Sequence, residues 1–366
     1  MSKMQVRNFA VVLSVGVAVL LAAQSSFGGT VAVGNCRAHL VSYSTISAAV
    51  AAVTPNSTVL ICPGTYPEQV TITQALSLKG LKDTTGAWPV IAVPSGGLAG
   101  GSGAQLSVQG AFDNQIGPVN VSNLIVDGAG SGVDCSTGSL TGIEYFIAFG
   151  SLDNVEVRNQ NPGGCGYGIT AGAPESNVEV SIRNSYIHDF DNTGVLAGNT
   201  GAETTLNLTA NRIASTSATV QAGVMYSFSA GGLASGNTIA VVGGQIGLAL
   251  EGFYCCSTAK DNAIVGSTVG IFLGGYNGGP TTIANNVLSN NGTGIVIGDE
   301  ESSVIRSNVI LQSSVVAIDL TCKQNSKVVN NTFFGAPVGV ANMSPGEIVR
   351  QNSFFSVTTP TTTCSP

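Results

Sequence analysis

The sequence is poor in charged and aromatic residues. Charged residues make up 9% of the 366 positions and aromatic residues 6%, with two histidines and one tryptophan. The 13 lysines and arginines are outnumbered by 20 acidic residues, which argues against nucleic acids and anionic membranes as partners. Tight binding of polyanionic sugars would need a local basic patch or a cation. The low charge suits a turn-rich all-β extracellular protein better than a helical enzyme.

The N-terminus has the pattern of a signal peptide. Lys3 and Arg7 precede an apolar run at residues 9–23, and small residues follow up to Gly28. The run is shorter than the roughly 20 residues that a membrane span needs. We expect cleavage near Gly28, a secreted or periplasmic product, and no membrane insertion of the mature chain. An uncleaved N-terminal anchor is the alternative.

The sequence is rich in glycine, with 48 residues. It also contains a recurring asparagine that has an aliphatic or aromatic residue two places later. The copies are Asn123, Asn184, Asn211, Asn237, Asn262, Asn286, Asn308, Asn331 and Asn352, with Asn154 as a looser match. Their spacing falls from 31 to 21 residues along the chain. A repeat of this length is typical of a solenoid that adds one supersecondary unit per copy.

A second signal, a small residue followed by an aliphatic one, lies between the asparagines. It occurs at Gly142, Gly168, Gly194, Gly223, Gly247, Gly270, Gly294, Ala317 and Gly339. We interpret each repeat as three short strands: one at this small–aliphatic pair, one ending at the asparagine and one starting just after it. Asparagine tolerates the left-handed backbone of a tight turn, and stacked amides can bond along the axis. All ten asparagines are therefore predicted to be structural.

Eight cysteines in a secreted chain predict disulfides, for which 105 connectivities exist. Neighbouring coils stack about 4.8 Å apart, so only cysteines on one edge and about one coil apart can bond. The repeat register predicts Cys135–Cys165 and Cys322–Cys364, which leaves Cys36–Cys62. Cys255 and Cys256 lie about three coils from Cys322. They pair with each other or with another chain, or they stay free.

One helix is predicted, at residues 46–53, with Thr45 or Ser44 as its N-cap and Pro55 as its stop. It is apolar nearly all round, which suits a plug over the open end of a solenoid. Strand patterns follow at residues 58–62 and 70–72, on either side of a turn.

This opening, residues 45–50, 57–66 and 68–72, resembles that of pectin-lyase-like right-handed parallel β-helix proteins, pectin methylesterases among them. The tandem repeats are similar to the parallel β-helix repeat of that superfamily, and the resemblance covers about residues 36–355. It implies an all-β, single-stranded right-handed parallel β-helix of about ten or more coils, three strands each. It is weak for function, because the superfamily contains lyases, hydrolases, esterases, epimerases and non-enzymes.

The resemblance divides the chain into four parts. Residues 1–28 are the signal peptide, and residues 29–75 hold the N-terminal cap and the first coil. Residues 76–355 form the β-helix repeats, and residues 356–366 are a Thr-rich C-terminal tail.

Catalytic motifs of these enzymes are missing. A methylesterase-like site needs an aspartate nucleophile that residues 144–150 lack, and Trp88 comes too early for the Arg-Pro-Trp motif. Polygalacturonase-like and alginate-epimerase-like motifs are absent too. Pectate-lyase-like chemistry, with calcium-binding acids near an arginine base, stays open because its spacing is less rigid.

One column of residues has the composition of an acid–base site. Asp127, Arg158 and His188 each follow a repeat asparagine by four residues, and Glu156 and Tyr186 precede the last two. If these side chains point outward, His188 could act as a general base tuned by Arg158 and the acids. A surface ion-pair ladder that joins the coils is the alternative interpretation.

Ligand-binding candidates lie in the loops after the Gly-Ile strands. The substrate-binding set is Tyr226, Phe228, Glu251, Tyr254, Tyr276 and Asn277, with Phe253 beside it. Aromatic rings on consecutive coils suit the faces of pyranose sugars, although they could also pack under their own loops. Asp299, Glu300 and Glu301 could bind calcium, or they could simply be solvated. We expect no required cofactor beyond this calcium option.

The outer face of the Gly-Ile strands is mainly apolar in its middle, which predicts covering by a loop or self-association. Two functions follow. The first is a non-catalytic extracellular β-helix that binds polysaccharide or assembles at the cell surface. The alternative is a polysaccharide lyase or esterase acting on a uronate-rich polymer.

Overall fold

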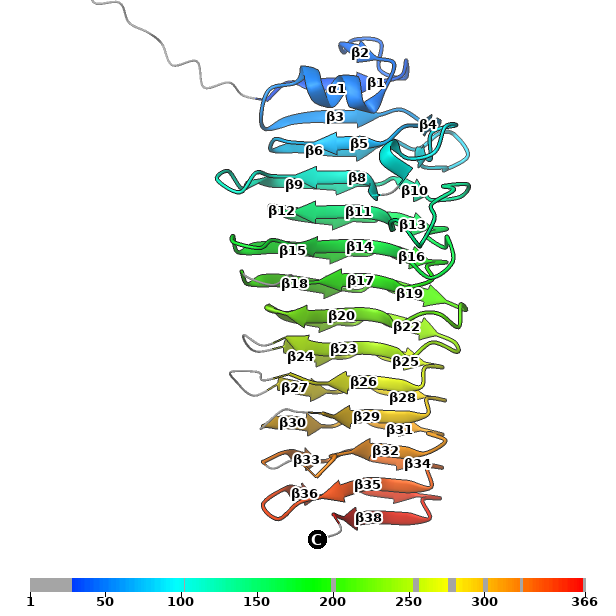
Figure 1. Cartoon of the computed structure of the whole chain (residues 1–366), viewed down its shortest axis with the longest axis vertical. Coiled ribbons are helices and arrows are strands. Elements are labelled where there is room, and N and C mark those ends of the chain that lie inside the picture. Colours follow the sequence, from blue (N-terminus) through cyan, green and yellow to red (C-terminus); the bar gives the residue numbers. More distant parts are fainter. Residues whose placement is uncertain are drawn as a thin grey trace, which may run out of the picture.

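The computed structural model describes residues 28–101, 103–198, 202–252, 257–275, 281–298, 302–322 and 325–364. In these residues the chain winds into a parallel β-helix, with three sheets running along its length (Figure 1). This confirms the solenoid and its three strands per coil. No helix in the described part of the chain is long and apolar enough to cross a membrane. The signal-peptide prediction falls almost entirely outside the described residues.

The strands of each coil enter the three sheets in turn. Sheet A contains β1 (Thr30–Val33), β2 (Ser42–Tyr43), β3 (Ser57–Ile61), β6 (Leu76–Gly80), β9 (Ile116–Ser122), β12 (Ala148–Asp153), β15 (Val178–Arg183), β18 (Thr204–Thr209), β21 (Ala230–Ser235), β24 (Ser257–Lys260), β27 (Thr281–Ala284), β30 (Ser303–Arg306), β33 (Lys327–Val329) and β36 (Ile348–Arg350). Sheet B contains β4 (Thr65–Pro67), β7 (Val90–Ala92), β10 (Ile125–Asp127), β13 (Glu156–Arg158), β16 (Tyr186–His188), β19 (Arg212–Ser215), β22 (Thr238–Val241), β25 (Ala263–Val265), β28 (Val287–Ser289), β31 (Val309–Leu311), β34 (Thr332–Phe334) and β37 (Ser353–Phe355). Sheet C contains β5 (Val70–Ile72), β8 (Gly103–Gln109), β11 (Leu140–Phe146), β14 (Gly166–Gly172), β17 (Thr193–Ala197), β20 (Ala222–Phe228), β23 (Ile246–Gly252), β26 (Val269–Leu273), β29 (Thr293–Ile297), β32 (Val316–Asp319), β35 (Val338–Met343) and β38 (Thr359–Thr363).

The core is a single apolar column inside the coils, because alternate residues of each strand point inward. Val126 and Val157, for example, are fully buried and directly paired between β10 and β13. The glycine of the Gly-Ile signal is required by close approach of the next coil. A Cβ at Gly168 would lie 2.4 Å from the carbonyl oxygen of Gly194.

The asparagine repeat separates into two positions. From Asn211 to Asn331 the asparagine is buried, and its oxygen accepts from the amide of the preceding ladder residue. Asn123, Asn154 and Asn184 instead have positive φ and occupy the turn one residue earlier. In the later coils the positive φ falls on the residue before the asparagine, such as Ala210. The predicted amide-to-amide bonding along the axis is therefore confirmed for the ladder copies. The predicted left-handed turn is found at Asn123, Asn154 and Asn184 and not at the ladder copies.

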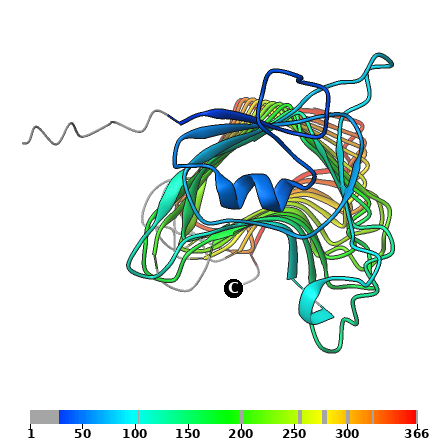
Figure 2. The same ribbon diagram turned by 90° about the horizontal axis from the view of Figure 1, so that it is seen from above.

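The N-terminal end of the solenoid is covered by α1 (Ile46–Ala52), which lies across the coil in the axial view (Figure 2). Thr45 caps it, as predicted, by accepting the amide of Ala48 at 3.1 Å. Glu68 adds a second cap, because its two carboxylate oxygens accept the amides of Ile46 (2.7 Å) and Ser47 (2.9 Å).

Three disulfides join Cys36 to Cys62, Cys135 to Cys165 and Cys322 to Cys364, as the repeat register predicts. Cys255 and Cys256 lie outside the described residues. The Thr-rich segment is no free tail, because Thr359–Thr363 form β38 and pair with β35 in the last coil.

Candidate functional site

The predicted acid–base residues lie together on the outer face of sheet B. Asp127 in β10 pairs directly with Arg158 in β13, and Glu156 pairs with Tyr186 in β16. His188 follows Tyr186 by two residues and so points to the same side. The buried valines between these residues set this register. The structure therefore places Asp127, Arg158 and His188 on the outer face of sheet B.

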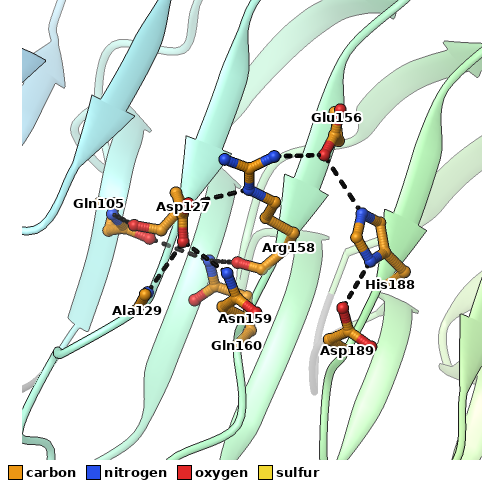
Figure 3. A network of polar contacts seen from close by, with 9 residues as sticks. All are labelled: Gln105, Asp127, Ala129, Glu156, Arg158, Asn159, Gln160, His188 and Asp189. Carbon is orange, nitrogen blue, oxygen red and sulfur yellow. Dashed lines mark hydrogen bonds and ion pairs between the residues drawn. The ribbon is translucent and has the colours of Figure 1, made fainter. Parts of the chain in front are cut away.

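Arg158 is the centre of the resulting network (Figure 3). Its Nε atom contacts Asp127 Oδ2 at 2.8 Å, and its Nη1 atom contacts Glu156 Oε1 at 2.9 Å. The guanidinium is partly screened from solvent, with 32% of the side chain exposed. Burial lowers the pKa of Arg158, but the hydrogen bonds and charges of the two carboxylates outweigh that effect and raise it. Arg158 is therefore a fixed cation and cannot serve as a base.

Asp127 is held as a carboxylate. Burial raises the pKa of Asp127, but three donors outweigh burial and lower it below its ordinary value. These donors are Asn159 Nδ2 at 2.7 Å, the backbone amide of Ala129 at 3.0 Å, and Arg158.

The imidazole of His188 lies between two carboxylates. Its Nε2 atom is 3.3 Å from Glu156 Oε1, and its Nδ1 atom is 2.7 Å from Asp189 Oδ2. The ring stacks on Tyr186 with centroids 4.0 Å apart, and Arg212 covers Tyr186 at 4.6 Å. Both ring nitrogens thus already have acidic partners, and the side chain is only 15% exposed.

A cavity of about 380 Å³ lies next to this network, at Asp189. Its lining includes Asp189, Asn161 and the hydroxyl-rich run Ser215–Thr219. The Asp189 side chain is 52% exposed, so one end of its carboxylate contacts His188 while the rest faces the cavity side.

Asp191 shapes the far wall of this cavity. Its buried carboxylate accepts the backbone amides of Gly163, Gly164 (2.7 Å) and Gly166 (2.6 Å) and so folds the loop before β14 around itself. Thr219 closes the floor by donating to the carbonyl of Asp191 at 2.6 Å. The cavity therefore has fixed walls built from polar groups.

Sequence reasoning missed Asp189, Asp191 and the hydroxyl run. The run Ser-Thr-Ser-Ala-Thr at residues 215–219 was a readable signal, since it interrupts the apolar pattern directly after a sheet B strand. The role of Asp189 depends on a positive φ of 55°, which no local pattern specifies.

The predicted aromatic ligand site is not assembled as expected. Tyr226 is fully buried and donates to the carbonyl of Leu206 at 3.2 Å, so its prediction as a ligand-binding ring is wrong. The strand period places it inward, two residues after buried Val224. Phe228 is half exposed, and burial raises the pKa of half-buried Glu251. Tyr254, Tyr276, Asn277, Asp299, Glu300 and Glu301 lie outside the described residues.

The outer face of sheet C carries a smaller cavity of about 90 Å³, lined by Glu144, Thr170 and Leu196 among others. Glu144 Oε2 accepts the hydroxyl of Ser107 at 3.1 Å. In the lining of this cavity Glu144 is the single ionisable acid, and no histidine, lysine or arginine accompanies it. This face therefore offers less acid–base chemistry than sheet B.

Solved structures with this fold are distant in sequence. The A-module of mannuronan C-5 epimerase AlgE4 from Azotobacter vinelandii is 15% identical, with 87% of this chain and 93% of that chain covered and a TM-score of 0.54. The GH136 lacto-N-biosidase from Eubacterium ramulus is 14% identical, with 89% and 68% covered and a TM-score of 0.59. PfbA, a surface adhesin of Streptococcus pneumoniae, is 14% identical, with 85% of each chain covered and a TM-score of 0.52. These similarities show the fold.

At the sequence level, no curated protein matches the chain. A family model does match, over residues 150–363, which is more than half of the chain and includes the coils from β13 to the last. Its description is NosD, periplasmic copper-binding protein. The chain belongs to the NosD family of parallel β-helix proteins.

Proposed function

We propose that this protein is a secreted or periplasmic β-helix that binds carbohydrate at the cavity beside Asp189. One observation carries the proposal: the contact of His188 Nδ1 with Asp189 Oδ2, at 2.7 Å, holds the Asp189 carboxylate at a cavity lined by hydroxyl and amide groups. Sugars are recognised through such groups, which accept from and donate to their hydroxyls. The volume, about 380 Å³, is within the range of small-ligand sites.

The local charge favours a neutral sugar at this cavity. Asp189 and Asp191 both line the cavity, and the carboxylate of Asp191 is engaged by backbone amides. No lysine or arginine is among the residues that line it. A uronate carboxylate would face repulsion there, whereas the hydroxyls of a neutral pyranose would not.

Binding is favoured over turnover by the state of the basic groups. A general base needs a free lone pair within reach of the substrate proton. Both nitrogens of His188 already face carboxylate oxygens, and Arg158 is paired twice. The alternative function, a lyase or esterase, is supported by the grouping of Arg158, His188 and Glu156 in one network. The fold alone does not choose between these functions.

The family description names copper, which prefers imidazole and sulfur ligands. The two histidines lie apart, His39 in the N-terminal loop and His188 in β16, and the six described cysteines are all in disulfides. The described residues also contain no group of three histidine, cysteine, aspartate or glutamate side chains arranged for a metal. They do not fit a copper centre, and the proposal does not use one.

Calorimetry with neutral oligosaccharides tests the proposal, together with an isosteric variant. Asp189→Asn keeps the shape and the positive φ but removes the charged acceptor, so affinity should fall at least about 10-fold. Asp261→Asn is the matched control, because Asp261 is also exposed and also has positive φ, 58°, on another coil. The affinity of the Asp261→Asn variant for the oligosaccharide should stay within about two-fold of the affinity of the parent protein. Equal losses in both variants, or no binding by the parent protein, would refute the proposal.

A turnover assay separates binding from catalysis. The mature protein is incubated with polygalacturonate, methylated pectin and alginate, with and without calcium, and unsaturated product, methanol and reducing ends are followed. The binding proposal expects none of the three to form. Product formation that His188→Ala abolishes would establish the lyase or esterase instead.

A further inference from the structure

The basic residues of this acidic chain are concentrated on one line of sheet A. Strand pairing from coil to coil aligns a single outward position, the last before the turn into sheet B. Five of the 13 lysines and arginines occupy it: Lys79, Arg183, Lys260, Arg306 and Arg350. One acid, Asp153, stands in the same line. We call this line the basic column.

The two halves of the basic column differ in charge balance. In the N-terminal half, Arg183 is neutralised by Asp153, with Nε and Oδ1 3.2 Å apart. In the C-terminal half, Lys260, Arg306 and Arg350 have no ion-pair partner among the described residues. Asp261 follows Lys260 in the exposed turn, and Glu347 precedes Arg350 by three residues and accepts the amide of Ser344. Three cations are therefore available to a ligand.

The outward residues beside these cations include both polar and apolar side chains. The neighbouring outward position of the same strands is occupied by Thr258, Thr282, Val304, Lys327 and Ile348. Lys327 is exposed and adds a fourth cation beside the column. The strands concerned, β24, β27, β30, β33 and β36, stack directly on one another along one side of the molecule (Figure 1).

The spacing identifies the ligand. Lys260, Arg306 and Arg350 stand on alternate coils, so consecutive cations are about 10 Å apart at about 4.8 Å per coil. One coil rises by close to the length of one pyranose unit in an extended chain. Cations on alternate coils therefore face the carboxylates of alternate sugars. From this match we infer that the C-terminal half of the basic column binds an extended polyuronate chain lying along the helix axis.

A nucleic acid matches this surface less well. It carries a phosphate about every 3.4 Å of strand, far denser than one cation per two coils. Single-stranded nucleic acids are also held by aromatic stacking, and none of the outward residues on β24, β27, β30, β33 and β36 is aromatic.

A charge-matched pair of double variants tests the inference, with oligogalacturonates and alginate oligomers as probes. Arg306→Gln with Arg350→Gln removes two cations from the column. Arg37→Gln with Lys82→Gln removes the same charge from the N-terminal loops. The first variant should lose at least about 10-fold in affinity at low salt, and the second less than about two-fold, because contact and not net charge determines binding. Unchanged far-ultraviolet circular dichroism and melting temperature establish that both fold.

Probe length provides an independent test. Four coil steps separate Lys260 from Arg350, a span of about 19 Å. Oligomers that reach across it should bind tightly, and dimers should not. Equal losses in the two double variants, no dependence on length, or tighter binding of single-stranded DNA of the same charge would overturn the inference.

This polyuronate surface and the Asp189 cavity are distinguishable in the same experiments. They lie on different sheets, so Asp189→Asn should leave polyuronate affinity unchanged. If the column variants keep full polyuronate binding while Asp189→Asn loses neutral sugar, the basic-column inference fails and the cavity proposal stands. The reverse pattern retains the column and refutes the cavity.

Discussion

Single charged residues in this protein connect coils that are far apart in sequence. Arg158 reaches Asp127 across 31 residues, and His188 reaches Glu156 across 32. Because each coil otherwise contacts its neighbours through backbone ladders and the apolar core, such pairs add directional links on the outer surface. The most enclosed of these carboxylates, Asp127, is 17% exposed and accepts from three donors.

Asp127→Asn should destabilise the protein in a pH-dependent way. A carboxyl whose pKa is lowered in the folded state stabilises the fold above its ordinary value of about 3.9, and this contribution disappears as the pH falls through the folded-state pKa. At pH 7 we expect a loss of about 1–3 kcal/mol in the free energy of unfolding. The variant and parent should begin to converge as the pH falls below about 4, and they should coincide below the folded-state pKa of Asp127.

Denaturant titrations at pH 7, 5 and 3 measure this difference, and exposed Asp261→Asn is the control. A deficit for Asp127→Asn that stays constant across the three pH values would show that its charge is not what stabilises the fold.

At the scale of an element, the turn between sheets A and B is what defines the repeat. From Asn211 onward, each ladder asparagine satisfies backbone groups in two coils at once. The oxygen of Asn262 accepts the amide and the side chain of Asn237, both at 3.0 Å, and its own side chain donates to Ala234 and Asn286. In the wider N-terminal coils Ser185 takes the ladder position and Asn184 moves into the turn.

Asn262→Ala should therefore strongly destabilise the folded protein. It removes side-chain donors and an acceptor from a site that is 1% exposed, leaving the Asn237 amide and the Ala234 carbonyl without partners. Each buried group left unsatisfied costs about 1–3 kcal/mol, so we expect a total of about 2–5 kcal/mol. Thermal and denaturant unfolding measure the loss.

Asn207→Ala makes the same chemical change on the half-buried outer face of sheet A and should cost less than about 1 kcal/mol. Comparable losses for Asn262→Ala and Asn207→Ala would contradict a special role for the ladder.

For the whole molecule, the repeat pattern predicted a solenoid with three strands per coil and two of the disulfide pairs, the family resemblance implied the parallel β-helix, and Cys36–Cys62 followed as the remaining pair. A solenoid makes this achievable because each coil contacts only its neighbours, so register in sequence becomes position in space. The same register placed Asp127, Arg158 and His188 in one column, and the structure shows that the column faces outward. The register also showed that Tyr226 follows inward Val224 by two residues, although its aromatic character favoured a ligand role.

Features that depend on loops could not be predicted from the register of the repeats. The cavity at Asp189 is formed where the loop before β14 folds around Asp191, and nothing in the repeat predicts that loop. The basic column could not be predicted from the sequence for a different reason. Successive basic residues along it stand up to 104 residues apart in sequence, as Lys79 and Arg183 do, and only strand pairing aligns them.

The two ends of the solenoid are protected differently, which leads to a prediction about how the molecule opens. At the N-terminus α1 covers the core, whereas Val349, Phe354 and Val357 in the last coil remain partly exposed. β36, β37 and β38 are each the final strand of their sheet, and Pro360 in β38 lacks the amide that would extend sheet C. The disulfide from Cys322 to Cys364 ties this coil down.

Replacing Cys322 and Cys364 with serine should loosen the last coils and leave the others intact. The bond spans 42 residues, for which the chain-entropy model gives about 4 kcal/mol. Amide hydrogen exchange in β36–β38 should accelerate most, with the effect declining toward β30, because a one-dimensional array frays from its unsupported end. Serine at Cys135 and Cys165, beside β11 and β14 in the N-terminal third of the array, is the control and should not speed exchange in β38. If β38 exchanges at the parent rate without its disulfide, then backbone pairing with β35 alone protects it, and the C-terminal end is not where the solenoid begins to unfold.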